Sequence, residues 1–495
     1  MDAMSSSRFS GSRLPEGPKT KKEVQTKVES EVEIVDLTVE QMKSHGLQSD
    51  TLCITNINEI VIIISSQSNR HHEALAEDLK SDIIQQSHIL NKDAPIVHLT
   101  HIDFPDVVGA WTILPLIPYL RKLHHGNCSW FFFMEDKTRI RLGELLELLN
   151  GYDYTQEMWL GHAIRDREAT IIHHFQFFED PQRFAYPNAA SGFAISAGLM
   201  KRLEVQWGRR KTSSADFSID YAYELALFIW NDKKGTELTH APRLCRSAKG
   251  NCATYSTSFQ HCETSVPKTS IYFAVKTCGK FHGDRVTVVK GTWGKYAEII
   301  RYFSDVEDEA IPTISLGIPN TEQGHCGKTI AILQYVANEI ENRPEIKWII
   351  IADDDTILSV ARIQKFLSCY NDSEQIVLGE RYGFNVYNED GYNYITGGGG
   401  IIFSRGSMQN VVNSNMCKCP SISSPDDMFL GVCFRRLKIE VIHSSLFHQA
   451  RPVDYAPEYL KDENVVSFHK HWMIDPFAVY NQWFQQEDTQ MHNEL

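Results

Sequence analysis

Residues 129–162 read SWFFFMEDKTRIRLGELLELLNGYDYTQEMWLGH, and residues 347–380 read KWIIIADDDTILSVARIQKFLSCYNDSEQIVLGE. The two stretches align without a gap at a constant offset of 218 positions, so that Trp matches Trp, one acidic turn matches another, and Leu-Gly matches Leu-Gly. After ten additional residues in the first copy, FAYPNAASGFAISAG from Phe184 aligns with YNYITGGGGIIFSRG from Tyr392. The chain therefore contains an internal repeat, since a chance match would not stay ungapped over this length.

Each copy of the repeat predicts the same order of elements. An apolar strand ends in an acidic turn, an amphipathic helix follows, and a strand ending in Leu-Gly leads into a hairpin of small residues. Upstream, the apolar strands EIVIIISS (residues 59–66) and SIYFAVKT (residues 270–277) begin the two copies. Strands that alternate with helices predict an α/β fold with a mostly parallel sheet in each copy.

The repeat also predicts where the domains begin and end. Residues 1–50 are polar and charged, which predicts an N-terminal tail with one short helix near residues 38–45. Two α/β domains are predicted at residues 51–245 and 268–495. Residues 246–267, which are rich in Ser and Cys, are predicted to form a linker between them.

The overall charge excludes several classes of partner. The 495 residues include 49 Lys and Arg against 63 Asp and Glu, which gives a formal net charge of −14. Nucleic-acid binding depends on basic groups that neutralise phosphates, so we expect no nucleic-acid partner. A polybasic membrane contact is disfavoured for the same reason. No apolar run approaches the roughly 18 residues of a membrane-spanning helix, so no transmembrane segment is predicted.

Cysteine usage and the chain ends bear on the cellular compartment. The 11 cysteines are an odd number, so at least one is unpaired within the chain. The sequence contains no CxxC pair, so a zinc site of that kind is not expected. The first 23 residues contain no apolar segment typical of a secretory signal. The last four residues, HNEL, resemble the KDEL retrieval address, which predicts the endoplasmic reticulum lumen and a KDEL-type retrieval receptor as partner. We interpret the conflict to mean that the natural precursor begins elsewhere.

The sharpest local signal is WIIIADDDT at residues 348–356. A buried strand that ends in Asp353, Asp354 and Asp355 brings three carboxylates to the C-terminal edge of a sheet, where open α/β sheets bind ligands. Crowded carboxylates repel one another, and their oxygen atoms favour a hard cation such as Mg²⁺ or Mn²⁺. Such an ion can hold a diphosphate. The alternative is a solvated acidic turn without a ligand.

A second signal is SSPDDMFLG at residues 423–431. Ser424 as N-cap and Pro425 as first helical residue predict the start of a helix with two acids in its first turn. These carboxylates complement the helix dipole, which is the purely structural interpretation. The functional interpretation is that one of them accepts a proton from an attacking hydroxyl group.

Histidine and glycine clusters supply further candidates. In VVSFHKHW, which begins at Val465, His469 follows a short strand and is a candidate metal ligand, although a lone histidine is more often structural. His469 and His471 together also suggest zinc, but no third nitrogen or sulfur ligand is evident from the spacing. His443 and His448 are further candidates. In TGGGG, which begins at Thr396, a ligand can approach the backbone closely at Gly398 and Gly399, or the glycines form a tight turn.

Taken together, these motifs resemble the Fringe and core-1 galactosyltransferase group of inverting β-1,3-glycosyltransferases, which have the GT-A fold. The resemblance rests on FAVKTCGKFHGDRVTVVKGTW, WIIIADDDT, YITGGGGIIFS, SPDDMFLG, SLFHQARP and VVSFH, which occur in the family's order over about 220 residues. It implies two tandem GT-A-like, Rossmann-like domains.

The resemblance also implies residue roles. Asp355 and His469 match the family's metal ligands, with Asp353 in the same turn, and Asp427 matches the catalytic base. His448 is the reserve for the metal-binding histidine, because the FHSH segment of Fringe enzymes aligns there. The residues implied to contact the nucleotide sugar are Thr277, Arg285, Asp305, Asp353, Asp354, Gly398 and Gly399.

The two-copy layout, FHQARPVDY, the segment from Ser467 and the KDEL-like ending narrow the implied reaction. The resemblance implies transfer of glucose from UDP-glucose, with Mn²⁺ or Mg²⁺, onto O-linked fucose of thrombospondin type 1 repeats. Three alternatives stay open: a Fringe-like or core-1-like transfer from another UDP-sugar, a non-catalytic carbohydrate-binding or folding factor of the lumen, and an α/β binding module without enzymatic function.

The first copy departs from the metal-binding pattern. Glu135, Asp136 and Lys137 stand where the second copy has three aspartates, and no PDD-like segment follows. A lysine at the position of Asp355 places a positive charge where the ion would bind. We therefore expect the first domain to be a degenerate, non-catalytic relative of the second, which supports the fold or holds the protein acceptor.

Overall fold

The computed structural model describes residues 54–210 and 216–494. Contacts group residues 52–495 into a single compact unit. The predicted tail at residues 1–50, with its short helix, lies outside the described residues. Two large sheets with flanking helices confirm the α/β class. We call residues 54–256 the first half and residues 268–494 the second half.

The first half is built on a six-stranded sheet with the order β10-β5-β8-β3-β1-β2. β1 pairs in parallel with β2 and β3, whereas β8 runs antiparallel to β3 and β5. The central strands are apolar because helices cover both of their faces. The strands are β1 (Ile60–Ser65), β2 (Ile96–Leu99), β3 (Trp130–Glu135), β5 (Trp159–Gly161), β8 (Phe193–Ser196) and β10 (Thr239–His240).

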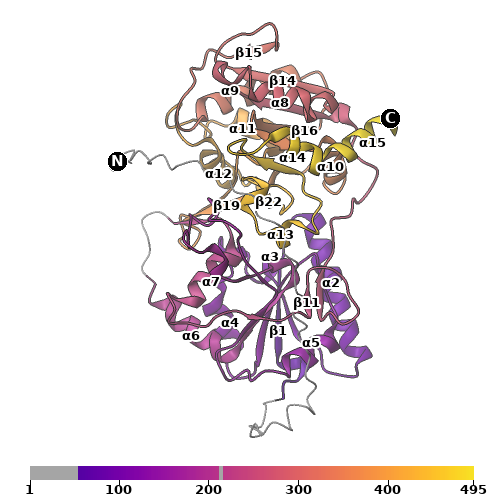
Figure 1. Ribbon diagram of the computed structural model, residues 1–495, viewed down its shortest axis with the longest axis vertical. Helices are drawn as coiled ribbons and strands as arrows, with labels where there is room; N and C mark the ends of the chain where they lie inside the picture. The colour runs from indigo at the N-terminus through magenta and orange to yellow at the C-terminus, as the bar shows by residue number, and fades with distance from the viewer. Residues whose placement is uncertain (1–53, 211–215, 495) are drawn as a thin grey trace, which may run out of the picture. The chain divides into compact units, whose positions relative to one another are not determined.

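Helices pack on the two faces of this sheet and make two apolar clusters (Figure 1). α2 and α5 cover the face that carries Ile60 and Ile62. α4, α6 and α7 cover the opposite face, which carries Val61 and Ile63. The helices are α2 (Arg70–Ile89), α3 (Thr100–Asp103), α4 (Ile117–Leu123), α5 (Leu142–Leu149), α6 (Ala197–Gly208) and α7 (Tyr221–Trp230).

The second half repeats this topology in a seven-stranded sheet with the order β15-β14-β13-β16-β21-β18-β22. Read from β22 to β14, its strand order and directions correspond to those of the first sheet from β10 to β2, and β15 is added at the edge. The strands are β13 (Ile271–Lys276), β14 (Ile299–Ser304), β15 (Thr313–Ser315), β16 (Trp348–Asp353), β18 (Ile376–Gly379), β21 (Ile401–Ser404) and β22 (Glu440–His443).

Helices again cover both faces of the second sheet. α8, α10, α14 and α15 lie on one face, and α9, α11 and α12 lie on the other. The short helix α13 lies in the segment of chain between β22 and β23. The helices are α8 (Arg285–Gly291), α9 (Cys326–Glu339), α10 (Val360–Leu367), α11 (Arg405–Asn413), α12 (Asp426–Leu437), α13 (Pro457–Leu460), α14 (Pro476–Trp483) and α15 (Gln485–Glu494).

Four small sheets complete the fold, and two of them lie beside the acidic turns. They are β11-β12-β4, β17-β23, β20-β19-β9 and β6-β7. Their strands are β4 (Thr138–Ile140), β6 (Ala163–Ile164), β7 (Tyr186–Pro187), β9 (Phe217–Ser218), β11 (Leu244–Cys245), β12 (Thr254–Ser256), β17 (Thr356–Leu358), β19 (Arg381–Phe384), β20 (Tyr392–Ile395) and β23 (Ser467–His469). β12 lies inside the segment predicted as a linker, so residues 254–256 form part of the first half.

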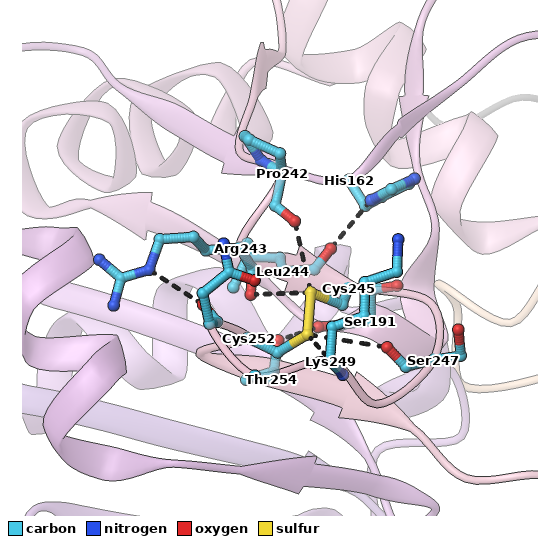
Figure 2. The surroundings of a disulfide bond; sticks show 12 residues. His162, Ser191, Pro242, Arg243, Leu244, Cys245, Ser247, Lys249, Cys252 and Thr254 are labelled. Carbon is cyan, nitrogen blue, oxygen red and sulfur yellow. Dashed lines mark hydrogen bonds between the residues drawn. A yellow bond between two sulfur atoms is a disulfide. The ribbon is translucent and has the colours of Figure 1, made fainter. Parts of the chain in front are cut away.

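Disulfides fix the segments that connect these sheets. Cys245–Cys252 closes the loop between β11 and β12, where His162 also donates to the carbonyl oxygen of Leu244 (Figure 2). Cys262–Cys369 and Cys326–Cys419 join more distant segments of the second half. The expectation of an unpaired cysteine is confirmed, because free thiols remain at Cys128, Cys278, Cys417 and Cys433. Within the described residues, no helix is both long and apolar enough to cross a membrane.

Candidate active site

The acidic turn of the second half lies at the C-terminal edge of its sheet, as the sequence predicts. β16 ends at Asp353 and pairs in parallel with β13, which places Lys276 directly beside Asp353. The Lys276 Nζ atom lies 3.1 Å from Asp353 Oδ1. Asp354 and Asp355 follow in the turn, and both are buried. Three carboxylates are therefore brought to one point of the sheet edge, within reach of basic side chains.

His469 reaches this turn through a strand pair that no local sequence pattern reveals. β23 runs antiparallel to β17, so that His469 lies opposite Thr356, the residue after the turn. Its Nε2 atom lies 3.1 Å from Asp355 Oδ1 and 3.7 Å from Asp353 Oδ2. Its Nδ1 atom donates to the carbonyl oxygen of Gln449 at 3.0 Å. This bond fixes the ring so that Nε2 faces the carboxylates, an orientation that suits a metal-binding imidazole.

These three residues fit a divalent metal ion. Ligand atoms of Asp353, Asp355 and His469 all lie within 4.8 Å of one another. Two carboxylates and one imidazole form a donor set that suits Mn²⁺ and Mg²⁺ better than a soft metal, which prefers sulfur. The second half thus contains an acidic site of the metal-binding type. His448, the reserve candidate, is not part of this ligand group. Its buried ring stacks on Phe468, with ring centroids 5.2 Å apart.

The glycine run supports the histidine. A Cβ atom on Gly398 would lie only 2.2 Å from His469 Nδ1, so a side chain at this position would displace the imidazole. The neighbouring Gly399 packs near the backbone of His448, and its carbonyl oxygen accepts a hydrogen bond from Ser467 Oγ at 2.6 Å. Both glycines, predicted as contacts of a nucleotide sugar, thus lie against the segment that carries His469.

Arg285 and Thr277 neutralise and orient the turn. The Arg285 guanidinium lies 3.0 Å from Asp354 Oδ1 and 2.9 Å from Asp355 Oδ2. Thr277 Oγ1 donates to Asp354 Oδ2 at 2.7 Å. Burial raises the pKa of Asp354 to about 6. Burial opposes ionisation of Asp355 as well, but His469 and Arg285 together hold its pKa below its usual value.

Asp427 lies on α12, whose first turn contacts the acidic turn through Lys276. The helix begins at Asp426, so Pro425 precedes it and Ser424, the predicted cap, lies one residue further out. Lys276 Nζ lies 2.6 Å from Asp426 Oδ2 and connects Asp426 with Asp353. Burial, followed by the adjacent Asp426 carboxylate, raises the pKa of Asp427 to about 6. A carboxylate with this pKa suits a general base that operates near neutral pH.

The other predicted nucleotide-binding residue lies at the same sheet edge. Asp305 follows β14, the parallel neighbour of β13, and its Oδ1 accepts a hydrogen bond from the backbone N–H of Gly279 at 2.9 Å. Two basic residues of this edge, Lys276 and Lys328, were not predicted. The Nζ atom of Lys328 donates to the carbonyl oxygen of Thr277 at 2.8 Å. A charged residue at the end of an otherwise apolar strand was the signal for Lys276.

The corresponding turn of the first half has different chemistry. Lys137, at the position of Asp355, donates to Ser445 Oγ at 2.7 Å and to Glu463 Oε1 at 3.1 Å, and its Nζ lies 3.5 Å from Glu135. Burial alone would lower the pKa of Lys137, but Glu463 and Glu135 raise it above its usual value, so the side chain stays charged. An ammonium group therefore binds two carboxylates here and ties the first half to the second.

Comparisons with known proteins show which family has sequences similar to this chain. The family model described as Fringe-like matches residues 116–249 and 266–490, which covers both copies of the repeat. The chain is 45% identical to human beta-1,3-glucosyltransferase over 92% of its own length and 91% of the relative, and 46% identical to the mouse protein over 86% and 87%. It is also 28% identical to chicken beta-1,3-N-acetylglucosaminyltransferase lunatic fringe, over 36% of this chain and 54% of that one.

Proposed function

The chain belongs to the Fringe-like family of glycosyltransferases, and from this premise we propose that it transfers glucose from UDP-glucose, in β-1,3 linkage and with inversion, to O-linked fucose on thrombospondin type 1 repeats. The observation that carries the proposal is the junction of the acidic turn with α12. Lys276 bridges Asp353 in the turn and Asp426 beside Asp427, so a candidate metal site and a candidate base lie at one edge of the second sheet.

We assign the donor to the turn. Asp353, Asp355 and His469 would hold Mn²⁺ or Mg²⁺, which when bound offsets the negative charge of the departing diphosphate. Thr277, Arg285 and Asp305 line the same edge and are the proposed contacts of the nucleotide, with Asp354 orienting Arg285. Holding the donor in a fixed position supplies much of the rate enhancement in transfers of this kind.

Asp427 is the proposed general base. It removes the proton from the 3-hydroxyl of the acceptor fucose while that oxygen attacks the anomeric carbon of glucose on the face opposite UDP. The C–O bond to UDP breaks as the new bond forms, which converts the α-linked donor into a β-linked product. The raised pKa of Asp427 favours this role, because a stronger base accepts the proton more readily.

The proposed location is the lumen of the endoplasmic reticulum. The ending HNEL supports retrieval by a KDEL-type receptor, and the relatives' curated names are those of glycosyltransferases. Three disulfides among the described residues support an oxidising compartment.

The test is transfer by the purified protein. Incubation with UDP-glucose, Mn²⁺ and an O-fucosylated thrombospondin type 1 repeat should add one hexose to the repeat, read by mass spectrometry. The repeat without fucose is the acceptor control, and UDP-galactose and UDP-N-acetylglucosamine are the donor controls. A product from another donor alone would replace glucose in the proposal. Binding of the fucosylated repeat without any product would instead favour a non-catalytic carbohydrate-binding factor.

A further inference from the structure

One small sheet contains strands from both halves of the protein. β9 of the first half pairs antiparallel with β19 of the second half, which pairs in turn with β20. Through this pairing, Phe217 lies opposite Phe384, and Phe384 lies opposite Tyr392. Directly opposed residues of neighbouring strands point to the same face of a sheet. The three aromatic side chains therefore form a row across the boundary between the halves, which we call the aromatic ladder.

The aromatic ladder is in contact along its length and is accessible at its outer end. The ring centroids of Phe217 and Phe384 are 5.1 Å apart, and those of Phe384 and Tyr392 are 5.6 Å apart. Phe217 is 39% exposed, whereas the other two rings are half-buried. The exposed ring of Phe217 and the two half-buried rings beside it form a continuous apolar surface that a partner can cover.

The inner end of the ladder lies beside Asp427. Gly431 follows Asp427 by four positions on α12, so the two residues share one face of the helix. A Cβ atom on Gly431 would lie 2.5 Å from the Cβ of Tyr394 and 3.1 Å from Cδ2 of Tyr392, which shows that this face packs directly on β20. Burial is the largest cause that raises the pKa of Tyr392, and the negative charge of Asp427 is the second.

The two acids in the first turn of α12 have different nearest neighbours. Asp426 points toward Lys276 and the acidic turn, where the donor is proposed to bind. Asp427, one residue later and about 100° further around the helix, belongs to the side of β20 and the ladder. An acceptor hydroxyl group placed at Asp427 therefore lies next to β20, the strand that carries the inner end of the aromatic ladder.

The first half also holds the back of this sheet. Trp111 Nε1 donates to Asn393 Oδ1 at 3.0 Å, and Asn393 points away from the ladder because it alternates with Tyr392 and Tyr394. The backbone N–H of Asn385 donates to the carbonyl oxygen of Asp216 at 2.7 Å, and the N–H of Asp216 donates to Asn385 Oδ1 at 2.9 Å, which extends the contact beyond the strand pair. The first half therefore fixes the hairpin and adds Phe217 to its front.

We propose that the aromatic ladder is the docking surface for the polypeptide part of the glycosylated acceptor, and that the first half contributes to acceptor binding through Phe217. The inference rests on the proposed function. An acceptor sugar placed at Asp427 is attached to a folded polypeptide, which must extend over the surface next to the base. Flat aromatic side chains provide large contact area at low entropic cost and commonly anchor such interfaces.

The test is the variant Phe217→Ala, with Phe178→Ala as matched control, because Phe178 is an exposed aromatic residue of the same half, 76% exposed. For an O-fucosylated thrombospondin type 1 repeat, we expect KM to rise about tenfold or more with kcat nearly unchanged. For a small fucoside without polypeptide, and for hydrolysis of UDP-glucose by water, no change is expected. The control variant should behave as the unsubstituted protein does, and Phe217→Tyr should retain acceptor affinity.

An unchanged KM for the fucosylated repeat would overturn the proposal, and so would an equal rise for the repeat and the small fucoside. If Phe217→Ala does not fold, Phe217→Leu, which keeps an apolar side chain of similar size but removes the ring, gives the comparison when paired with Phe217→Tyr. Calorimetric titration of the fucosylated repeat without donor separates a failure of the proposed docking surface from a failure of the proposed reaction. A protein that binds the repeat through Phe217 but transfers no glucose refutes the proposed reaction, not the docking surface.

Discussion

Ser256 in the first half and His469 in the second half hold the same position in their sheets. Ser256 lies opposite Thr138 in the pair β12–β4, and His469 lies opposite Thr356 in the pair β23–β17. The first half therefore lacks the histidine as well as the third aspartate of the candidate metal site. Its loss of metal-binding residues involves two strands that are remote in sequence.

The neighbouring contacts support this correspondence. Thr254, two residues before Ser256, donates to the carbonyl oxygen of Ser191, just as Ser467 donates to the carbonyl oxygen of Gly399. The same scaffold is thus built in both halves, and the second half carries the set of two aspartates and one histidine at these positions.

The candidate metal site predicts that the same Asp→Asn change has unequal effects in the two acidic turns. Asp355→Asn removes one carboxylate charge and should weaken Mn²⁺ binding at least about 100-fold, together with UDP binding. Asp136→Asn in the first half should leave both affinities unchanged. Isothermal titration of each variant with Mn²⁺ and then with UDP measures this, and equal manganese affinity in the two variants would contradict the assignment.

The contact between Gly398 and His469 predicts a steric effect. Gly398→Ala places a methyl group 2.2 Å from His469 Nδ1, so the imidazole must move and Mn²⁺ affinity should fall about tenfold or more. Gly397→Ala is the control, because a Cβ atom there meets no atom within 4 Å. Comparable manganese titrations of both variants decide the point; a loss in the control as large as that in Gly398→Ala would rule out the steric explanation.

Asp427 as base predicts a loss of turnover without a loss of donor binding. Asp427→Asn cannot accept the proton and should lower kcat by about 100-fold to 10,000-fold. The Kd for UDP should stay within about twofold, because Asp427 is not among the proposed contacts of the metal or the nucleotide. Steady-state kinetics and UDP titration test both parts, and near-normal turnover would show that another group is the base.

The raised pKa of Asp427 predicts a pH profile. Burial and the neighbouring Asp426 raise its pKa to about 6, so the reactive carboxylate is fully present above that pH and is lost as pH falls through it. We expect kcat/KM to be level at neutral pH and to fall about tenfold per unit below pH 6. Lys276, Tyr392 and Tyr394 also face this group, so the profile is recorded for Tyr392→Phe as well. An acid limb set by an ordinary aspartate, well below pH 6, would contradict the prediction.

Lys137 predicts a stability effect between the halves. Lys137→Met leaves Glu463 without its cationic partner at a largely buried position, which should lower the free energy of unfolding by about 2 kcal/mol. The double variant Lys137→Met with Glu463→Gln leaves no unpaired charge and should recover most of this loss. Chemical denaturation of the three proteins measures the difference; equal stabilities would show that the ion pair contributes nothing.

Part of the site was predictable because it depends on neighbouring residues. The apolar strand that ends at Asp353 and the helix start beside Asp427 follow from local patterns of burial and capping, and the structure places both at one edge of the sheet, with α12 beginning at Asp426. The choice between His469 and His448 did not follow from such patterns. His469 meets Asp355 across 114 positions of sequence, through the register of β17 with β23.

By itself the sequence determined the α/β class, the repeat, and the acidic turn with its lysine-containing counterpart. These features are periodic or contiguous in the sequence, and the pattern of apolar residues within each segment indicates them. Only the tertiary structure decided that His469 completes the ligand cluster, that Lys276 links the turn to α12, and that the first half extends a sheet of the second. The physical reason is that strand register and side-chain hydrogen bonds join residues that are distant in the chain, and such pairings leave no local spacing to read.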